Sequence, residues 1–229
     1  MSEKTITVAG FEATIIRKKV KNLRVTIVPP DGTVRVSAPK LMPETLIRAF
    51  LLEKADWIRT HRDKVRAQHR DEPKQFADGE TVRLFGQVCP LVVLTGQKKN
   101  GAALDGSRIV LSLRGDVPPE KREAILNDWL RERLKTEIEH FLPLWSDTTG
   151  LIPSAWTVRD MTSRWGSCNT KTKKITLNLQ LVHYPLICLE YVILHELCHL
   201  RVHGHGADFK ALLDRFMPDW KARKKLLNG

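Results

Sequence analysis

The sequence has no apolar run close to the length that a bilayer-spanning helix needs, and residues 1–4 lack the apolar segment of a signal peptide. Its four cysteines show no C-x-x-C spacing, which argues against a cysteine zinc site. No glycine pattern has the spacing of a phosphate-binding loop, and we find no internal repeat. These absences predict a cytoplasmic protein with reduced thiols and no membrane partner.

Acidic residues are outnumbered, since 26 Asp and Glu face 38 Lys and Arg, and the net charge of the 229-residue chain is +12. An excess of this size suggests a polyanionic partner or substrate, such as a nucleic acid, a nucleotide or an acidic protein. An ordinary basic surface explains the charge equally well, because the chain has no recognisable nucleic-acid-binding motif. The hydrophobic content of 42% is that of a globular protein.

The order of apolar patterns predicts a mixed fold. Four β-branched segments in residues 5–36 predict antiparallel strands, with a turn at Pro30-Asp31-Gly32, and a long helix begins at Pro43. A second β region follows in residues 81–113, and a helix with an apolar stripe then ends before Pro143. Residues 156–159 and 175–181 predict two further strands, and Pro185 begins another helix.

The stretch 191–205 contains His195-Glu196-x-x-His199 among apolar residues. On a helix, residues four apart lie on one face, so both imidazoles can reach one ion. Glu196 lies one residue on, where it can hydrogen-bond a water on that ion, and this is the zincin arrangement of two ligands and a general base. A buried structural helix that happens to carry these residues is the alternative, but buried Glu is rare without a partner.

A third ligand is needed for a catalytic zinc site with one open position. His205 follows His195 by ten residues, which is the spacing of the three-His metzincin pattern. Gly204 can take the left-handed conformation that ends a helix and turns the chain back. His203 is the rival candidate, but on a continued helix it would point along the same rod as His199. The sequence therefore predicts Zn²⁺ bound by His195, His199 and His205.

Two residues before the motif are candidates for substrate binding. Arg164 could contact an oxyanion or a phosphate, although a structural ion pair explains it as well. Trp165 is the other candidate, and packing is its alternative role. The strand at residues 175–181 is expected to pair with an extended substrate.

The Arg164-Trp165-Gly166-Ser167-Cys168 stretch and the His195-to-Leu200 stretch resemble the YgjP-like metallopeptidases, relatives of the SprT and WLM zincins. The resemblance covers nearly the whole chain, and three earlier stretches carry it as well: Pro30-Asp31-Gly32, Ser37-Ala38-Pro39 and Ala55-Asp56-Trp57-Ile58. It implies a mixed α/β zincin with His195, His199 and His205 on zinc and Glu196 as the base. Gly204 stands where the family usually has Asn, and Lys210 stands where it usually has Trp.

These observations predict an α+β protein. A β-rich region with one long helix would occupy residues 1–115, and a zincin-like metallohydrolase domain with an HExxH active-site helix would occupy residues 116–229. The leading function is zinc-dependent hydrolysis of a peptide or protein substrate, which could be anionic or bound to nucleic acid. The alternatives are a nucleoside triphosphate pyrophosphatase, an activity also associated with the family, and a nucleic-acid-associated protein with structural zinc. The pyrophosphatase would use basic side chains, especially Lys171, Lys173, Lys174 and Arg201.

Overall fold

The computed structural model describes residues 3–28, 31–68 and 74–228, and it divides into two compact units, Met1–Lys74 and Gln75–Gly229. The protein is a mixed α+β protein, as predicted. The boundary between the units differs from the predicted one at 115/116. The second β region belongs to the C-terminal unit, because Val82, Ile109 and Leu111 share one hydrophobic core with the helices that follow.

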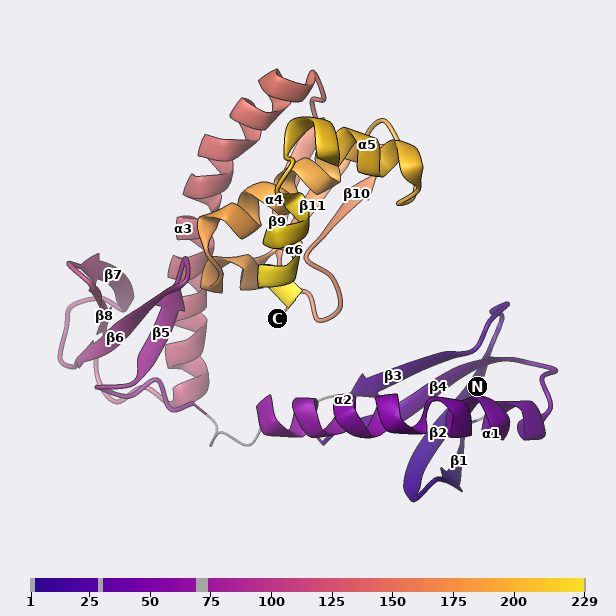
Figure 1. Ribbon diagram of the computed structural model, residues 1–229. Helices are drawn as coiled ribbons and strands as arrows, with labels where there is room; N and C mark the ends of the chain where they lie inside the picture. Colours follow the sequence, from indigo (N-terminus) through magenta and orange to yellow (C-terminus); the bar gives the residue numbers. More distant parts are fainter. Residues whose placement is uncertain (1–2, 29–30, 69–73, 229) are drawn as a thin grey trace. The chain divides into compact units, whose positions relative to one another are not determined.

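The first unit is a four-stranded sheet with two helices (Figure 1). Its strands are β1 (Glu3–Val8), β2 (Phe11–Lys18), β3 (Arg24–Val28) and β4 (Thr33–Pro39), in the spatial order β1-β2-β4-β3. β2 and β4 pair in parallel, so the sheet is not purely antiparallel as predicted. The predicted long helix is two helices, α1 (Glu44–Glu53) and α2 (Ala55–Gln68), because Lys54 leaves helical geometry between them. Pro30 of the predicted turn lies outside the described residues.

The second unit begins with a sheet of the same topology. Its strands are β5 (Thr81–Leu84), β6 (Gln87–Leu94), β7 (Gly101–Asp105) and β8 (Arg108–Ser112), in the order β5-β6-β8-β7. The pairing is again antiparallel, parallel and antiparallel. The two four-stranded sheets therefore have the same topology, although the sequence shows no internal repeat. A strand needs only alternating buried and exposed positions, and many different side chains can satisfy that pattern.

Helix α3 (Pro119–Thr149) follows and continues past the predicted end. Its buried residues recur every four positions: Leu126, Leu130, Leu134, Ile138, Leu142 and Ser146. Pro143 removes one helical hydrogen bond, at a cost of about 3 kcal/mol. Burial of the stripe on both sides of Pro143 outweighs this cost, and the helix ends only at Gly150, whose φ is 69°.

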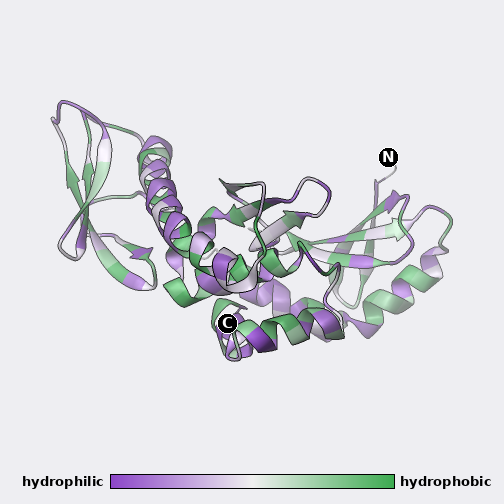
Figure 2. Cartoon of the chain, turned by 90° about the horizontal axis from the view of Figure 1, so that it is seen from above, coloured by the Kyte–Doolittle hydropathy of each residue, from purple (hydrophilic) through white to green (hydrophobic). Residues whose placement is uncertain are grey.

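The remaining elements surround the predicted motif. β9 (Ala155–Arg159), β10 (Gly166–Asn169) and β11 (Lys174–Asn178) form a three-stranded sheet in the order β10-β11-β9. A short 3₁₀ helix, η1 (Leu179–His183), leads to α4 (Leu186–Cys198), α5 (Ala207–Phe216) and α6 (Trp220–Asn228). Most elements carry both hydrophobic and hydrophilic residues, as expected for elements with one buried face (Figure 2). Within the described residues, no helix combines the length and the apolar character needed to cross a bilayer.

The β5–β6 turn supports the start of α4 through a glycine. Gly86 has a φ of 85°, and a Cβ atom added to it would lie 2.8 Å from Cγ of Pro185, the residue that precedes α4. Phe85 in the same turn donates its backbone N–H to the Val182 carbonyl at 2.7 Å.

We expect Gly86→Ala to lower the free energy of unfolding by about 3 kcal/mol, since left-handed backbone strain and overpacking against Pro185 add together. Gly106→Ala is the matched control, because Gly106 also has a positive φ but no atom within 4 Å of its added Cβ. The control should cost only about 1 kcal/mol. Urea unfolding of the two variants measures the difference, and equal losses would contradict the proposed contact with Pro185.

Candidate metal centre

Helix α4 positions the first two histidines in a buried setting. It is apolar around most of its circumference, and nine of its residues are buried: Cys188, Leu189, Tyr191, Val192, Ile193, Leu194, Glu196, Leu197 and Cys198. A helix of this kind is held in a core from several sides. His195 and Glu196 lie in its last turn, and His199 is its C-terminal cap.

His205 joins these two residues. One ring nitrogen from each of His195, His199 and His205 lies within 4.8 Å of the others, and Nε2 of His205 lies 3.1 Å from Nε2 of His195. Gly204 takes the left-handed conformation, with a φ of 82°. It does so in the loop between α4 and α5, since α4 has already ended at Cys198. The exposed His203, the rival candidate, does not belong to the group.

Contacts at Nδ1 orient the two histidines of the helix end. The Tyr191 hydroxyl lies 3.4 Å from Nδ1 of His195, and the Val202 carbonyl lies 3.2 Å from Nδ1 of His199. A carbonyl only accepts, so Nδ1 of His199 carries the proton and its Nε2 is left free. Such partners are the usual means of fixing the tautomer of metal-binding histidines.

Burial favours the neutral form of His195 and His199. It lowers the pKa of His195 to about 3, with the nearby His199 and His205 as further causes, and it also lowers the pKa of His199. Phe209, which is buried on α5, packs against all three rings with centroid distances of 4.8, 4.6 and 4.9 Å. Neutral imidazoles are the form that binds metals, so the group suits a cation.

Glu196 is buried beside β10. Its side chain is 4% exposed, and burial raises its pKa to about 8 while the charge of Arg164 acts in the opposite direction. Its Oε2 atom has no hydrogen-bond partner among the described residues. A Cβ atom on Gly166 would lie 2.6 Å from Oε1 of Glu196, so the carboxylate lies directly against the backbone of β10.

Arg164 and Trp165 lie just before β10 and differ in their surroundings. Arg164 is exposed and forms no ion pair with another described residue, so the structural ion pair considered as its alternative is absent there. Trp165 is half-buried, donates from Nε1 to Oδ1 of Asn228 at 3.2 Å and packs edge-on against Tyr184. These contacts indicate a packing role for Trp165.

Comparison with known families then identifies the chain. The family described as YgjP-like, metallopeptidase domain, matches residues 21–229. The chain belongs to the YgjP-like family. It is therefore a member of a family of metal-dependent hydrolases, and the three histidines are its candidate metal ligands.

No curated protein matches the YgjP-like chain. Among solved structures, the metallopeptidase zymogen abylysin of Pyrococcus abyssi is 20% identical, with a TM-score of 0.37, over 39% of this chain and 90% of its own. The metallopeptidase zymogen jannalysin of Methanocaldococcus jannaschii is 23% identical, with a TM-score of 0.36, over 40% of this chain and 87% of its own. The family match alone supports the assignment.

The three-stranded sheet of the YgjP-like chain corrects one expectation. Residues 175–181 are not a strand available to a substrate, because β11 ends at Asn178 and lies between β10 and β9. Both of its backbone edges are already paired. β10, which contacts Glu196 through Gly166, pairs only with β11 in the described part of the sheet.

Basic residues lie at the other end of this β10–β11 hairpin. Gly166 pairs with Leu177 near Glu196, whereas the last pair, Asn169 with Lys174, adjoins the turn that carries Lys171 and Lys173. Gly166 and Asn169 are three positions apart along β10, which corresponds to about 10 Å of strand. The lysines are exposed, as is Arg201 after α4.

Three residues of this site were not assigned a role from the sequence: Tyr191, Gly166 and Phe209. Tyr191 precedes His195 by four residues, so helical spacing could have found it. Gly166 lies within the stretch that resembles the family, although nothing in the sequence indicates that it faces Glu196. Phe209 carries no sequence signal beyond its apolar side chain. Of the two departures from the family pattern, Gly204 lies in the loop before His205, and Lys210 is exposed.

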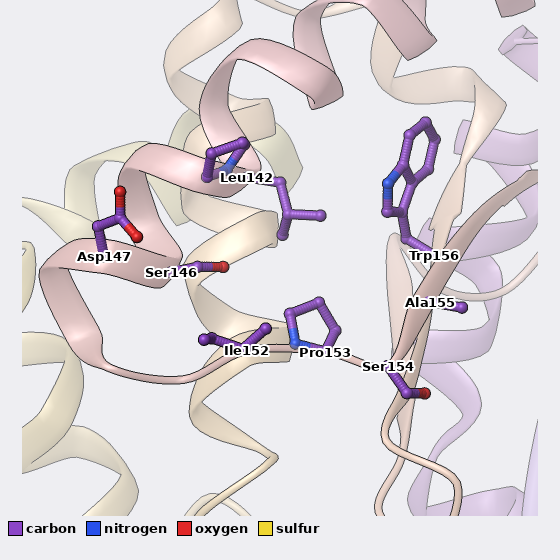
Figure 3. Close-up of a pocket in the computed structure, with 9 residues that line it drawn as sticks. Leu142, Ser146, Asp147, Ile152, Pro153, Ser154, Ala155 and Trp156 are labelled. Atoms are coloured by element: carbon purple, nitrogen blue, oxygen red, sulfur yellow. The ribbon is translucent and has the colours of Figure 1, made fainter.

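A separate hollow of about 600 Å³ lies between the end of α3 and the start of β9 (Figure 3). Its lining is mostly small or apolar: Leu142, Pro143, Ser146, Asp147, Ile152, Pro153, Ser154, Ala155 and Trp156. It contains none of the metal-site residues and none of the predicted substrate contacts.

Proposed function

We propose that this chain is a zinc-dependent peptidase, with His195, His199 and His205 as the metal ligands and Glu196 as the general base. The observation that supports this most directly is a buried carboxylate oxygen of Glu196 that has no hydrogen-bond partner among the described residues, next in sequence to one of three converging imidazoles. A set of three imidazole nitrogens suits zinc, and it leaves a position for water or substrate. A purely structural zinc site would need a fourth ligand and no base.

The chemistry divides between the metal and the protein. When bound, zinc acts as a Lewis acid that lowers the pKa of water and polarises a carbonyl group. Glu196 takes up the proton of the attacking water at Oε2 and passes it to the leaving amine. Its packing against Gly166 limits the movement of the carboxylate, so the base is held in position before substrate arrives.

A peptide substrate would lie along β10. An edge strand offers free backbone N–H and C=O groups, which an extended peptide can pair with. Arg164, immediately before this strand and exposed, is our candidate for contacting the carbonyl oxygen or an acidic group of the substrate. Trp165 remains a second candidate, with its contacts to Asn228 and Tyr184 favouring packing.

Hydrolysis of a nucleoside triphosphate at the same centre is the second candidate function. It is favoured by the exposed guanidinium group of Arg164, which has no ion-pair partner among the described residues. Typical phosphoryl-transfer sites hold magnesium with carboxylates. The metal-binding group found in the described chain contains histidine alone, and this favours the peptidase.

Purified, zinc-loaded protein incubated with labelled casein and, separately, with nucleoside triphosphates distinguishes these functions. We expect casein fragments, no release of pyrophosphate, and loss of cleavage on treatment with a chelator. Pyrophosphate release without cleavage of casein would replace the peptidase proposal with the nucleotide one. Zinc binding without either activity would favour a structural role for the metal, as in a nucleic-acid-associated protein.

Tyr191→Phe should weaken zinc binding about tenfold, because loss of the hydroxyl leaves Nδ1 of His195 without its partner. The chain has two tyrosines, so Tyr184→Phe is the matched control. Tyr184 packs against Trp165, and its substitution should leave zinc affinity unchanged. Competition with a chromogenic chelator measures both affinities. An unchanged affinity in Tyr191→Phe would show that the contact does not orient His195.

A further inference from the structure

Asn178 is a buried amide at the point where three segments meet. It is the last residue of β11, it caps η1, and it is only 3% exposed. Buried polar side chains are costly unless their hydrogen bonds are made. Those of Asn178 are made entirely with backbone groups.

Most of these bonds hold the segment before β10. The Nδ2 group donates to the Met161 and Arg164 carbonyls at 2.8 Å each, and Oδ1 accepts from the Met161 N–H at 3.2 Å. Oδ1 also accepts from the Gln180 N–H at 3.1 Å, which caps η1. The backbone N–H of Asn178 donates to the Trp165 carbonyl at 2.9 Å. One residue therefore fixes both ends of the segment 161–165.

This segment leads directly to the carboxylate of Glu196. Gly166, the next residue, lies so close to Glu196 that an added Cβ would be 2.6 Å from Oε1. Arg164, whose carbonyl is bound by Asn178, carries the positive charge that acts on Glu196. A small shift of the segment would therefore move two things at once: the backbone against which Glu196 packs, and the Arg164 charge that acts on Glu196.

We propose that Asn178 is a positioning residue for the catalytic centre, which holds the segment 161–165 so that Gly166 and Arg164 are correctly placed beside Glu196. This inference rests on the proposed function of Glu196. Asparagine is suited to the position because it offers two donors and one acceptor in a short, planar group. Aspartate would keep the cap on η1, but it would replace the Nδ2 donor by a carboxylate oxygen that faces the Met161 and Arg164 carbonyl oxygens without a proton to share.

The test compares Asn178→Ala and Asn178→Asp with Asn100→Ala. Asn100 is the matched control, because its exposed side chain also accepts from a backbone N–H, that of Arg114 at 2.8 Å. Asn100 precedes β7 and Arg114 follows β8, so the contact belongs to none of the segments described above. Zinc content, amide hydrogen exchange and steady-state cleavage of labelled casein are measured for each zinc-loaded full-length variant, at a temperature where all are folded.

We expect both Asn178 variants to retain zinc and to lose about 100-fold in kcat, with KM changed less than about threefold. Hydrogen exchange should accelerate in residues 161–166 and stay unchanged in α4. Adding Arg164→Ala to Asn178→Ala should lower kcat little further, because both substitutions affect the same arrangement. Asn178→Asp isolates the donor group, since only the two bonds that Nδ2 donates to the Met161 and Arg164 carbonyls should be lost, while Oδ1 can still accept from the Met161 and Gln180 N–H groups.

Unchanged exchange in residues 161–166 would overturn the inference, whatever the activity. Equal losses of kcat in Asn100→Ala and Asn178→Ala would also overturn it, because they would indicate a general effect of stability. Wild-type protein that leaves casein uncut would count against the proposed peptidase function, and the exchange measurement would still decide whether Asn178 holds the segment.

Discussion

Replacing Glu196 by Gln is expected to lower kcat by about 100- to 10,000-fold while the zinc content stays at the wild-type level. Gln keeps the shape of the side chain, so it still fits against Gly166, but it cannot take up a proton. Glu196 does not belong to the candidate ligand group of His195, His199 and His205, so its substitution should leave the metal bound. Casein cleavage and elemental analysis of the same preparation test both parts of the prediction.

Glu190→Gln is the matched control on the same helix. Glu190 forms a 2.7 Å ion pair with Arg223 of α6, so its substitution removes a partly buried carboxylate outside the candidate centre. This variant should cleave casein within about threefold of the wild-type rate, because the Glu190 carboxylate stabilises the structure and takes no part in proton transfer. If Glu196→Gln cleaves as fast as the wild type, Glu196 is not the base, even in a protein that holds zinc.

His205→Ala should weaken zinc binding by about 100-fold or more, since one of three protein ligands is lost. His203→Ala, two residues away in the same loop, should bind zinc as the wild type does, because the exposed His203 lies outside the group of three. Competition with a chromogenic chelator gives the two dissociation constants. The reverse result would transfer the role of third ligand to His203.

Gly204 lies between the two histidines in this loop. Its left-handed conformation turns the chain so that His205, rather than His203, reaches His195. The spacing of ten residues predicted His205 from the sequence, and the structure brings it together with the other two. The helix itself ends earlier than this prediction assumed, at Cys198.

Several features of the site followed from short-range geometry. His195 and His199 are four residues apart, and any helix through them places both on one face. The resemblance of the Arg164–Cys168 and His195–Leu200 stretches led to the YgjP-like family, which the match over residues 21–229 confirms. The mixed α+β class was also predicted correctly, since the periods of strands and helices are local properties.

Predictions that depended on distant partners were the ones that needed correction. Pro143 is a helix breaker by local rules, yet α3 continues because its stripe is buried on both sides. The apolar side chains of the second β region belong to the same core as the helices of the C-terminal unit, which a linear reading of the sequence could not reveal. Alternation alone could not tell that β11 lies in the middle of its sheet.

By itself, the sequence determined the family and pointed to the candidate ligands and the candidate base, because these depend on residue types at fixed spacings along one helix and its following loop. Only the tertiary structure decided what surrounds Glu196. Gly166 is 30 residues before it in the chain, and Asn178, which holds the segment leading to Gly166, is 18 residues before it. Such contacts arise when β10, β11 and α4 pack together, and the energy that selects that packing is spread over many buried side chains rather than encoded at any single spacing.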